Sequence, residues 1–328
     1  MGKHYRSALA ALAAVAAIAV VALLVSACSF GGSSASTSTK APAKKGPIRV
    51  GSKLDGEGVL LGQIIAQTLQ YHGFAIVDKT RTGATQVVRQ ALIKDQIDVY
   101  PEYTANALLI FHNDIKVKPS ILQSATLTWE AAKAEDAAVG VTWLWQAPAN
   151  DTWAIALPKA FATAHKLATV QDLADYIKGG GAFKIAGSQE YFTSPVAFPA
   201  FEKAYGFKLT PAQEVQVGTG DTALPEKTAA QGTDGVNAAM AYGTDGTISA
   251  LNLVVLADPK GAQSFYQPAP TFRTTVMDKY PEMGVWLNPV FVRLDMATLQ
   301  KLNKEVAVDG KDPKTVARNW LTATGFVK

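Results

Sequence analysis

Residues 48–80, IRVGSKLDGEGVLLGQIIAQTLQYHGFAIVDKT, contain one complete strand, helix and strand unit. The stretch opens with the short apolar run IRVGS, which is typical of a buried strand. From residue 58 to residue 72 the apolar side chains recur at helical spacing, and FAIVDKT then returns to the strand pattern. A helix of this length between two strands predicts a parallel βαβ connection.

The same alternation continues towards the C-terminus. Helical spacing is found over residues 85–95 and 169–178, and in the last third of the chain over 278–286, 295–306 and 312–324. Each of these last three begins at or near an Asp, a candidate N-cap. Further strands are predicted at IDVYP, TWAIALP, FKIAGS, VNAAMAY and LVVLAD. The pattern predicts an α/β protein with mostly parallel sheets that helices cover on both faces.

Composition excludes several classes of protein. The chain has 328 residues, of which 48% are hydrophobic and 18% charged, so it can bury a large core divided between two domains. Its single Cys excludes an intramolecular disulfide, and its four His show no HxH or HExxH spacing, so no metal or other cofactor is expected. The net charge of +4 is spread along the chain, which argues against a nucleic-acid partner.

The N-terminal segment has the pattern of an export signal. Lys3 and Arg6 precede an uncharged apolar run, residues 8–25, which ends in small residues directly before Cys28. We interpret residues 1–27 as a lipoprotein signal peptide and Cys28 as the lipidated mature N-terminus. Residues 28–47 are rich in Ser, Thr, Gly, Ala and Lys, which predicts a flexible linker. The protein is then exported and lipid-anchored to the outer face of the cytoplasmic membrane; the alternative is an uncleaved membrane anchor.

Four aromatic side chains lie at strand ends, beside small polar residues. They are Tyr103 in IDVYPEYTAN, Trp153 in ANDTWAIAL, Tyr242 in MAYGTDG and Tyr266 in SFYQPAP. Each one alone could be a half-buried aromatic that covers a sheet edge. Ligands of open α/β sheets bind beyond the strand ends, however, so the four rings together predict a shared binding site.

These segments resemble the ProX-type substrate-binding proteins of osmoprotectant ABC transporters, which bind glycine betaine, choline, carnitine and proline betaine. The resemblance covers residues 48–328 nearly throughout and rests on the order of its motifs. These are IRVGSK, DVYPEYT, ANDTWAIAL, FEKAYGF, AYGTDG, LVVLAD, KYPE, LNKEV and DGKDPKTVARNWL. It implies a two-lobed periplasmic-binding-protein-like fold of type II, with the ligand in the interlobe cleft. We expect lobe I to comprise residues 48–149 and 247–328, and lobe II residues 150–246.

The resemblance also implies a binding site. In that family an aromatic cage surrounds the trimethylammonium group, and the matching positions here are Tyr103, Trp153, Tyr242 and Tyr266. A quaternary ammonium has no N–H to donate, so π faces packed against its methyl groups are its natural partners. Asp151 matches a residue that lies near the cation in some members. The implied protein is a monomer without enzymatic activity, which captures a small quaternary-ammonium solute and delivers it to ABC permease subunits.

The other end of the ligand is where the sequence departs from the family pattern. Family members that hold a betaine carboxylate use a Lys, which survives here as Lys53, and a Thr, which Asn106 replaces. They also use an Arg in an FxxRxDG motif, where this chain has Ser194, with Val196 in place of the motif's Asp. These replacements weaken the case for bidentate carboxylate capture and make choline a rival to glycine betaine. Lys53 could equally be a structural ion-pair partner.

Three other functions stay open. The fold could bind a different solute, such as an amino acid or another organic cation. An exported lipoprotein enzyme could use Asp98, Glu102 and Asp151 as paired carboxylates, although no nucleophile accompanies them. A structural or adhesive lipoprotein is supported only by the anchor.

Overall fold

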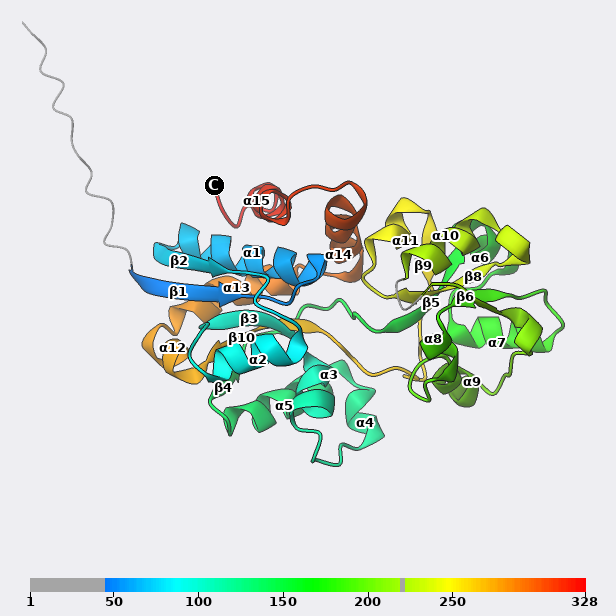
Figure 1. The fold of residues 1–328 in the computed structure, drawn as a ribbon, viewed down its shortest axis with the longest axis horizontal. Helices are drawn as coiled ribbons and strands as arrows, with labels where there is room; N and C mark the ends of the chain where they lie inside the picture. The colour runs from blue at the N-terminus through cyan, green and yellow to red at the C-terminus, as the bar shows by residue number, and fades with distance from the viewer. Residues whose placement is uncertain (1–44, 219–221) are drawn as a thin grey trace, which may run out of the picture. The chain divides into compact units, whose positions relative to one another are not determined.

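The computed structural model describes residues 45–218 and 222–328, which form two five-stranded sheets with helices around them (Figure 1). The expected signal peptide, Cys28 and nearly all of the expected linker lie outside the described residues. Within the described ranges, no helix has the length and apolar character needed to cross a bilayer. We call the first sheet with its helices lobe I and the second sheet with its helices lobe II.

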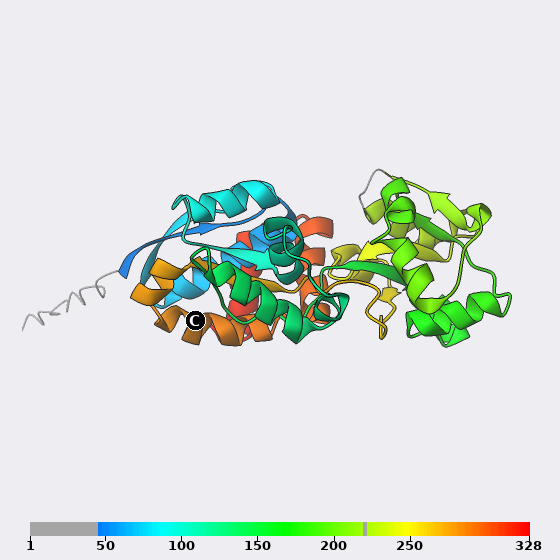
Figure 2. The same cartoon turned by 90° about the horizontal axis from the view of Figure 1, so that it is seen from below.

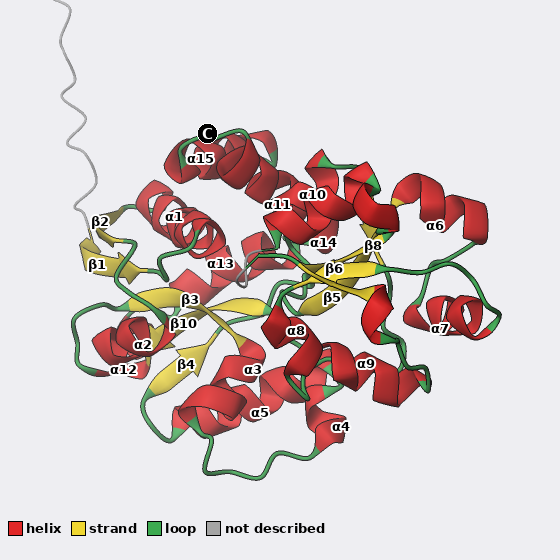
Figure 3. Ribbon diagram, turned by 45° about the vertical axis from the view of Figure 1, so that its right-hand side comes forward, coloured by secondary structure: helices red, strands yellow, loops and turns green. Residues whose placement is uncertain are grey.

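Lobe I contains a sheet with the strand order β2-β1-β3-β10-β4. Its strands are β1 (Lys45–Gly51), β2 (Phe74–Lys79), β3 (Val99–Tyr103), β4 (Val141–Trp143) and β10 (Pro268–Arg273). One face packs against α1 (Gly56–Tyr71), α13 (Glu282–Val292), α14 (Met296–Asn303) and α15 (Pro313–Ala323). The other face packs against α2 (Thr85–Ile93), the π-helical η1 (Ala107–Phe111) and α5 (Ala125–Ala137). The sheet is therefore buried on both sides, as the sequence predicted (Figure 3).

Helix α1 shows why this lobe forms. The Asp55 side chain accepts a hydrogen bond from the Gly58 N–H at 2.6 Å and so caps the helix. Every residue from Gly58 to Leu69 is buried, because the helix lies between the sheet and the C-terminal helices. A helix that is enclosed on all sides needs mostly apolar residues around its circumference. The buried polar side chains of this helix are hydrogen-bonded: Gln63 donates to Asp78, Gln67 to the Lys314 carbonyl and Thr68 to the Ile64 carbonyl.

Lobe II contains a sheet with the strand order β7-β6-β8-β5-β9. Residues of its strands alternate between the two faces of the sheet: Ile155 and Met240 belong to the large core on one face, whereas Ala156 and Ala239 belong to two smaller clusters on the other. The small alanines let α10 and α11 approach that face closely. The strands are β5 (Trp153–Pro158), β6 (Ile185–Gly187), β7 (Glu214–Gln216), β8 (Ala238–Tyr242) and β9 (Leu253–Val255), and the helices are α6 (Lys159–His165), α7 (Val170–Lys178), α8 (Gln189–Thr193), α9 (Phe198–Tyr205), α10 (Ala223–Gln231) and α11 (Gly246–Ala250).

Short helical segments complete the described chain. They are α3 (Thr104–Asn106), α4 (Pro119–Leu122), η2 (Pro211–Gln213), η3 (Thr233–Gly235), α12 (Thr274–Lys279) and η4 (Lys304–Val308).

Two expectations about the sheets need correction. Each sheet has two parallel and two antiparallel pairings, so neither is mostly parallel. The antiparallel pairings all involve β10 or β5, the strands by which the chain enters one sheet from the other. The return to lobe I also comes later than residue 247, because β9 is hydrogen-bonded to β5 in lobe II. The two links between the sheets are residues 144–152 and 256–267, and both are visible between the two groups of elements in Figure 2.

The predicted C-terminal helices are partly right. Asp295 and Asp312 cap α14 and α15 through the N–H groups of Thr298 and Thr315, as predicted. The expected single helix over residues 278–286 is wrong. The chain breaks between α12 and α13 at Pro281, which has no N–H with which to continue the helix.

Candidate functional site

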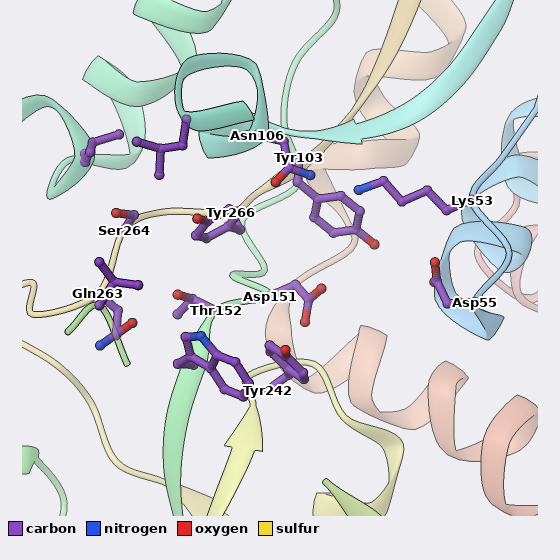
Figure 4. A pocket seen from close by; sticks show the side chains of 14 residues that line it. Lys53, Asp55, Tyr103, Asn106, Asp151, Thr152, Tyr242, Gln263, Ser264 and Tyr266 are labelled. Carbon is purple, nitrogen blue, oxygen red and sulfur yellow. The ribbon is translucent and has the colours of Figure 1, made fainter. Parts of the chain in front are cut away.

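A cavity of about 440 Å³ is lined by residues of both lobes and of both links between them (Figure 4). All seven residues that the sequence assigned to ligand binding line this cavity. The cavity therefore brings together positions that are up to 213 residues apart, between Lys53 and Tyr266. Its lining is Lys53, Asp55, Tyr103, Asn106, Leu109, Leu122, Asp151, Thr152, Trp153, Val196, Tyr242, Gln263, Ser264 and Tyr266.

Strand register places the aromatic side chains. In lobe II, Trp153 begins β5 and Tyr242 ends β8, and the two residues are direct partners in the antiparallel pairing. Their rings stack with centroids 4.3 Å apart and planes 23° apart, as cross-strand aromatic pairs do. In lobe I, Tyr103 ends β3 and pairs with Pro268, two residues after Tyr266. The turn of the chain out of each sheet thus brings the four rings to one cavity.

The ring of Tyr103 is fixed at its far end. Its hydroxyl donates to Glu57 Oε1 at 2.7 Å, and Glu57 belongs to the first turn of α1. Tyr103 is only 4% exposed, so the hydrogen bond holds a buried phenol in one orientation. Burial and the neighbouring Glu57 carboxylate raise the pKa of Tyr103 well above its ordinary value, and the phenol stays neutral.

Lys53 and Asn106 meet at one buried carboxylate. Parallel pairing of β1 and β3 sets Val50 opposite Val99, and three residues further along the chain come Lys53 and Glu102. Lys53 Nζ lies 2.9 Å from Glu102 Oε1, and Asn106 Nδ2 donates to the same oxygen at 2.8 Å. The ammonium also lies 4.3 Å from the centroid of the Tyr103 ring. Lys53 is therefore held by groups of the protein itself.

Asp151 lies between Tyr103 and Tyr242 in Figure 4. Its backbone N–H donates to the carbonyl of Tyr266 at 3.0 Å, and its Oδ1 accepts from the hydroxyl of Thr244 at 2.9 Å. Burial, followed by the nearby Asp245 carboxylate, raises the pKa of Asp151 to about 7, because both disfavour its charged form. A cation in the cavity would reverse this effect.

A second cavity of about 350 Å³ shares Asp55, Asp151 and Tyr242 with the first. Glu57 and Asp245 also line it, and none of its lining residues is Lys, Arg or His. Burial, and then the charge of Asp151, raises the pKa of Glu57 to about 8, although hydrogen bonds from Tyr103, Thr244 and Asn303 oppose the shift. The side of the site that faces α1 and α14 thus has an excess of carboxyl groups. The remaining lining is Gly56, Thr244, Gly246, Asn303, Val306 and Ala307.

The sequence missed part of the lining. Three of the missed residues lie in the two links, close in sequence to residues that were predicted, and this closeness could have identified them: Thr152, Gln263 and Ser264. The sequence gives no such indication for Leu109 and Leu122, which have the pattern of ordinary apolar helix residues. Val196 lines the cavity and is 69% exposed, whereas Ser194 is not among the lining residues. Across residues 45–218 and 222–328, no group of His, Cys, Asp or Glu side chains is arranged to hold a metal ion.

Similarity to known proteins agrees with this geometry. Residues 46–323 match the family described as the substrate binding domain of the ABC-type glycine betaine transport system. The chain is 47% identical over 283 residues to the glycine betaine-binding protein YehZ of Escherichia coli, covering 86% of this chain and 92% of YehZ. It is 30% identical over 283 residues to a glycine-betaine-binding protein of Pseudomonas aeruginosa, covering 84% of this chain and 86% of that protein.

A solved structure gives the same result. The chain superposes on apo YehZ from Escherichia coli with a TM-score of 0.81, covering 86% of this chain and 99% of that one. The comparison confirms the two-lobed periplasmic-binding-protein-like fold that the resemblance implied. The chain belongs to the family of substrate-binding domains of ABC-type glycine betaine transport systems, which are binding proteins and not enzymes.

Proposed function

We propose that the protein binds a quaternary-ammonium solute, glycine betaine or choline, in the larger cavity and delivers it to an ABC permease. The observation that carries the proposal is the convergence of Tyr103, Trp153, Tyr242 and Tyr266 around Asp151 in one cavity. Neutral aromatic faces attract a cation that cannot donate hydrogen bonds, and the Asp151 carboxylate adds charge. The names of the two relatives, both glycine betaine binders, support this choice of solute.

The expected interaction energy fits a transport protein. Four desolvated cation–π contacts at about 1 to 2 kcal/mol each give roughly 4 to 8 kcal/mol, compared with about 8 kcal/mol for a micromolar complex. Burial of the methyl groups against Leu109, Leu122 and Val196 adds to this. The cage together with apolar burial is therefore of the right size for a micromolar complex.

Calorimetric titration of the purified protein tests the proposal. We expect saturable binding of glycine betaine, choline and carnitine, and no binding of glycine, which has the carboxylate but lacks the trimethylammonium group. Binding of glycine with an affinity similar to that of glycine betaine would instead identify an amino-acid site. The absence of a binding signal with all three trimethylammonium solutes would disprove the proposed function.

Binding proteins of ABC importers work outside the cytoplasm, and we propose that this one is held there by a lipid on Cys28. Two or more acyl chains on one residue give stable membrane attachment, whereas one chain gives only reversible attachment. Cys28→Ser is expected to move most of the protein from the membrane fraction to the soluble fraction, as measured by immunoblot of fractionated cells. Ser29→Ala, one position further along the chain, is the matched control and should stay with the membrane. Unchanged membrane association of Cys28→Ser would favour the uncleaved anchor.

A further inference from the structure

Lys53 is the only cationic side chain among the described residues that line either cavity. A carboxylate on a bound solute would therefore have this one ammonium group as its charged partner. Asp55 and Asp151 line the same cavity and repel a carboxylate. Whether the protein already offsets the charge of Lys53 therefore decides how strongly the site attracts the carboxylate end of a zwitterionic solute.

Glu102 is the carboxylate that pairs with Lys53. It is 0% exposed and does not line either cavity. Its Oε1 forms an ion pair with Lys53 Nζ at 2.9 Å and accepts from the Tyr103 N–H at 2.7 Å and from Asn106 Nδ2 at 2.8 Å. Its Oε2 accepts from the Tyr100 hydroxyl at 2.8 Å. One buried carboxylate thus contacts three residues of the site and offsets the charge of the cationic one.

We infer that Glu102 is a specificity-determining residue. Its negative charge offsets the positive charge of Lys53, so that the site recognises the ammonium end of the solute rather than a carboxylate. The inference rests on the proposed function and deepens it. A solute carboxylate that approached Lys53 would have to share the ammonium with Glu102, a charge of its own sign at hydrogen-bond distance. The preferred solutes are trimethylammonium compounds whose other end needs only neutral donors, such as the amide of Asn106.

The test compares the affinities of choline and glycine betaine for matched variants by calorimetric titration. Glu102→Gln keeps the shape of the side chain and removes its charge, so Lys53 becomes available to a carboxylate. We expect the ratio of Kd for choline to Kd for glycine betaine to rise about tenfold over wild type, which corresponds to about 1.4 kcal/mol. An unchanged ratio, with both solutes weakened equally, would show that Glu102 is merely structural and would overturn the inference.

Tyr100→Phe is the matched control, because it removes the hydrogen bond to Oε2 and leaves the Oε1 contacts in place. We expect it to change the ratio less than threefold, while a tenfold change would overturn the inference. The double variant Lys53→Gln/Glu102→Gln supplies the test if Glu102→Gln does not fold, because it removes both charges of the buried pair and leaves neither uncompensated. If Glu102 offsets the charge of Lys53 in the wild type, the double variant should shift the ratio less than threefold. Selective loss of glycine betaine binding by tenfold or more would show that Lys53 holds the carboxylate.

The outcomes separate the inference from the proposed function. If wild type binds neither solute, the proposed function fails and the inference fails with it. If wild type binds both and Glu102→Gln leaves the ratio unchanged, the cage stands and the role of Glu102 is overturned.

Discussion

Trp153→Ala is expected to weaken the binding of glycine betaine and choline by tenfold to about a hundredfold, or about 1 to 3 kcal/mol. The substitution removes the larger of two stacked rings, and it also leaves Tyr242 without its partner at 4.3 Å. Trp153→Phe restores an aromatic face and should recover part of the affinity. Calorimetric titration measures the effect, and circular dichroism shows whether β5 and its sheet are retained.

Trp145→Ala is the control for this prediction. Trp145 is 53% exposed and lies outside the lining of both cavities, so the same change of residue type should leave the affinity unaltered. Equal affinities of Trp153→Ala and wild type, in a folded protein, would contradict the role of the ring in binding.

Raising the pH from 6 to 9 is expected to strengthen choline binding by about tenfold, because the carboxyl groups of Asp151 and Glu57 become charged. The pKa values of Asp151 and Glu57 are raised to about 7 and about 8, so both carboxyl groups ionise within this range. Choline keeps the same charge throughout. The raised pKa values of Tyr103 and Tyr242 keep those phenols neutral. Calorimetric titration at several pH values measures how the affinity for choline changes with pH, and Asp151→Asn should remove much of this change.

The same two groups predict how the stability of the free protein depends on pH. A carboxyl whose pKa is higher in the folded than in the unfolded state binds its proton more tightly when folded. The contribution of these two groups to the free energy of unfolding therefore decreases as the pH rises from about 4 to about 8. Thermal unfolding without ligand should show the decrease, and Asp151→Asn should flatten it. An increase in stability over this range would contradict the shifted pKa values.

The convergence of the four aromatic residues on one cavity could be predicted because they lie at or next to strand ends. A strand end is visible in a sequence as the point where an apolar run meets small polar or turn residues. Glu102 could not be assigned to the binding site in this way, since the sequence offers it only as part of DVYPEYT and as a carboxylate of the alternative enzyme. Its proximity to Lys53 depends on the pairing of β1 with β3, which requires the order of the strands and not only their existence.

Strand β10 shows a second limit of the sequence. Its segment PAPTFR contains Pro268 and Pro270, and proline argues against a central strand because it cannot donate a hydrogen bond. In the structure the carbonyls of these prolines accept from the N–H groups of Ala147 and Leu144 in the first link. The two prolines thus take part in the pairing as acceptors, and a segment that looks like a loop pairs in the interior of the sheet.

Asp151 and Tyr266 line the cavity and also belong to the links between the lobes, which affects how the solute preference of the protein can evolve. Each belongs to one of the two links between the lobes, and the two links are joined by the hydrogen bond from Asp151 N to the Tyr266 carbonyl. Tyr266 N in turn donates to Asn150 Oδ1 at 2.7 Å. Asp151 and Tyr266 make these bonds with main-chain atoms, so a substitution at either residue replaces the side chain in the cavity and keeps the groups that join the links. Mutational routes to a new solute can therefore pass through these two positions as well as through Val196 or Leu122, which line the cavity from outside the links.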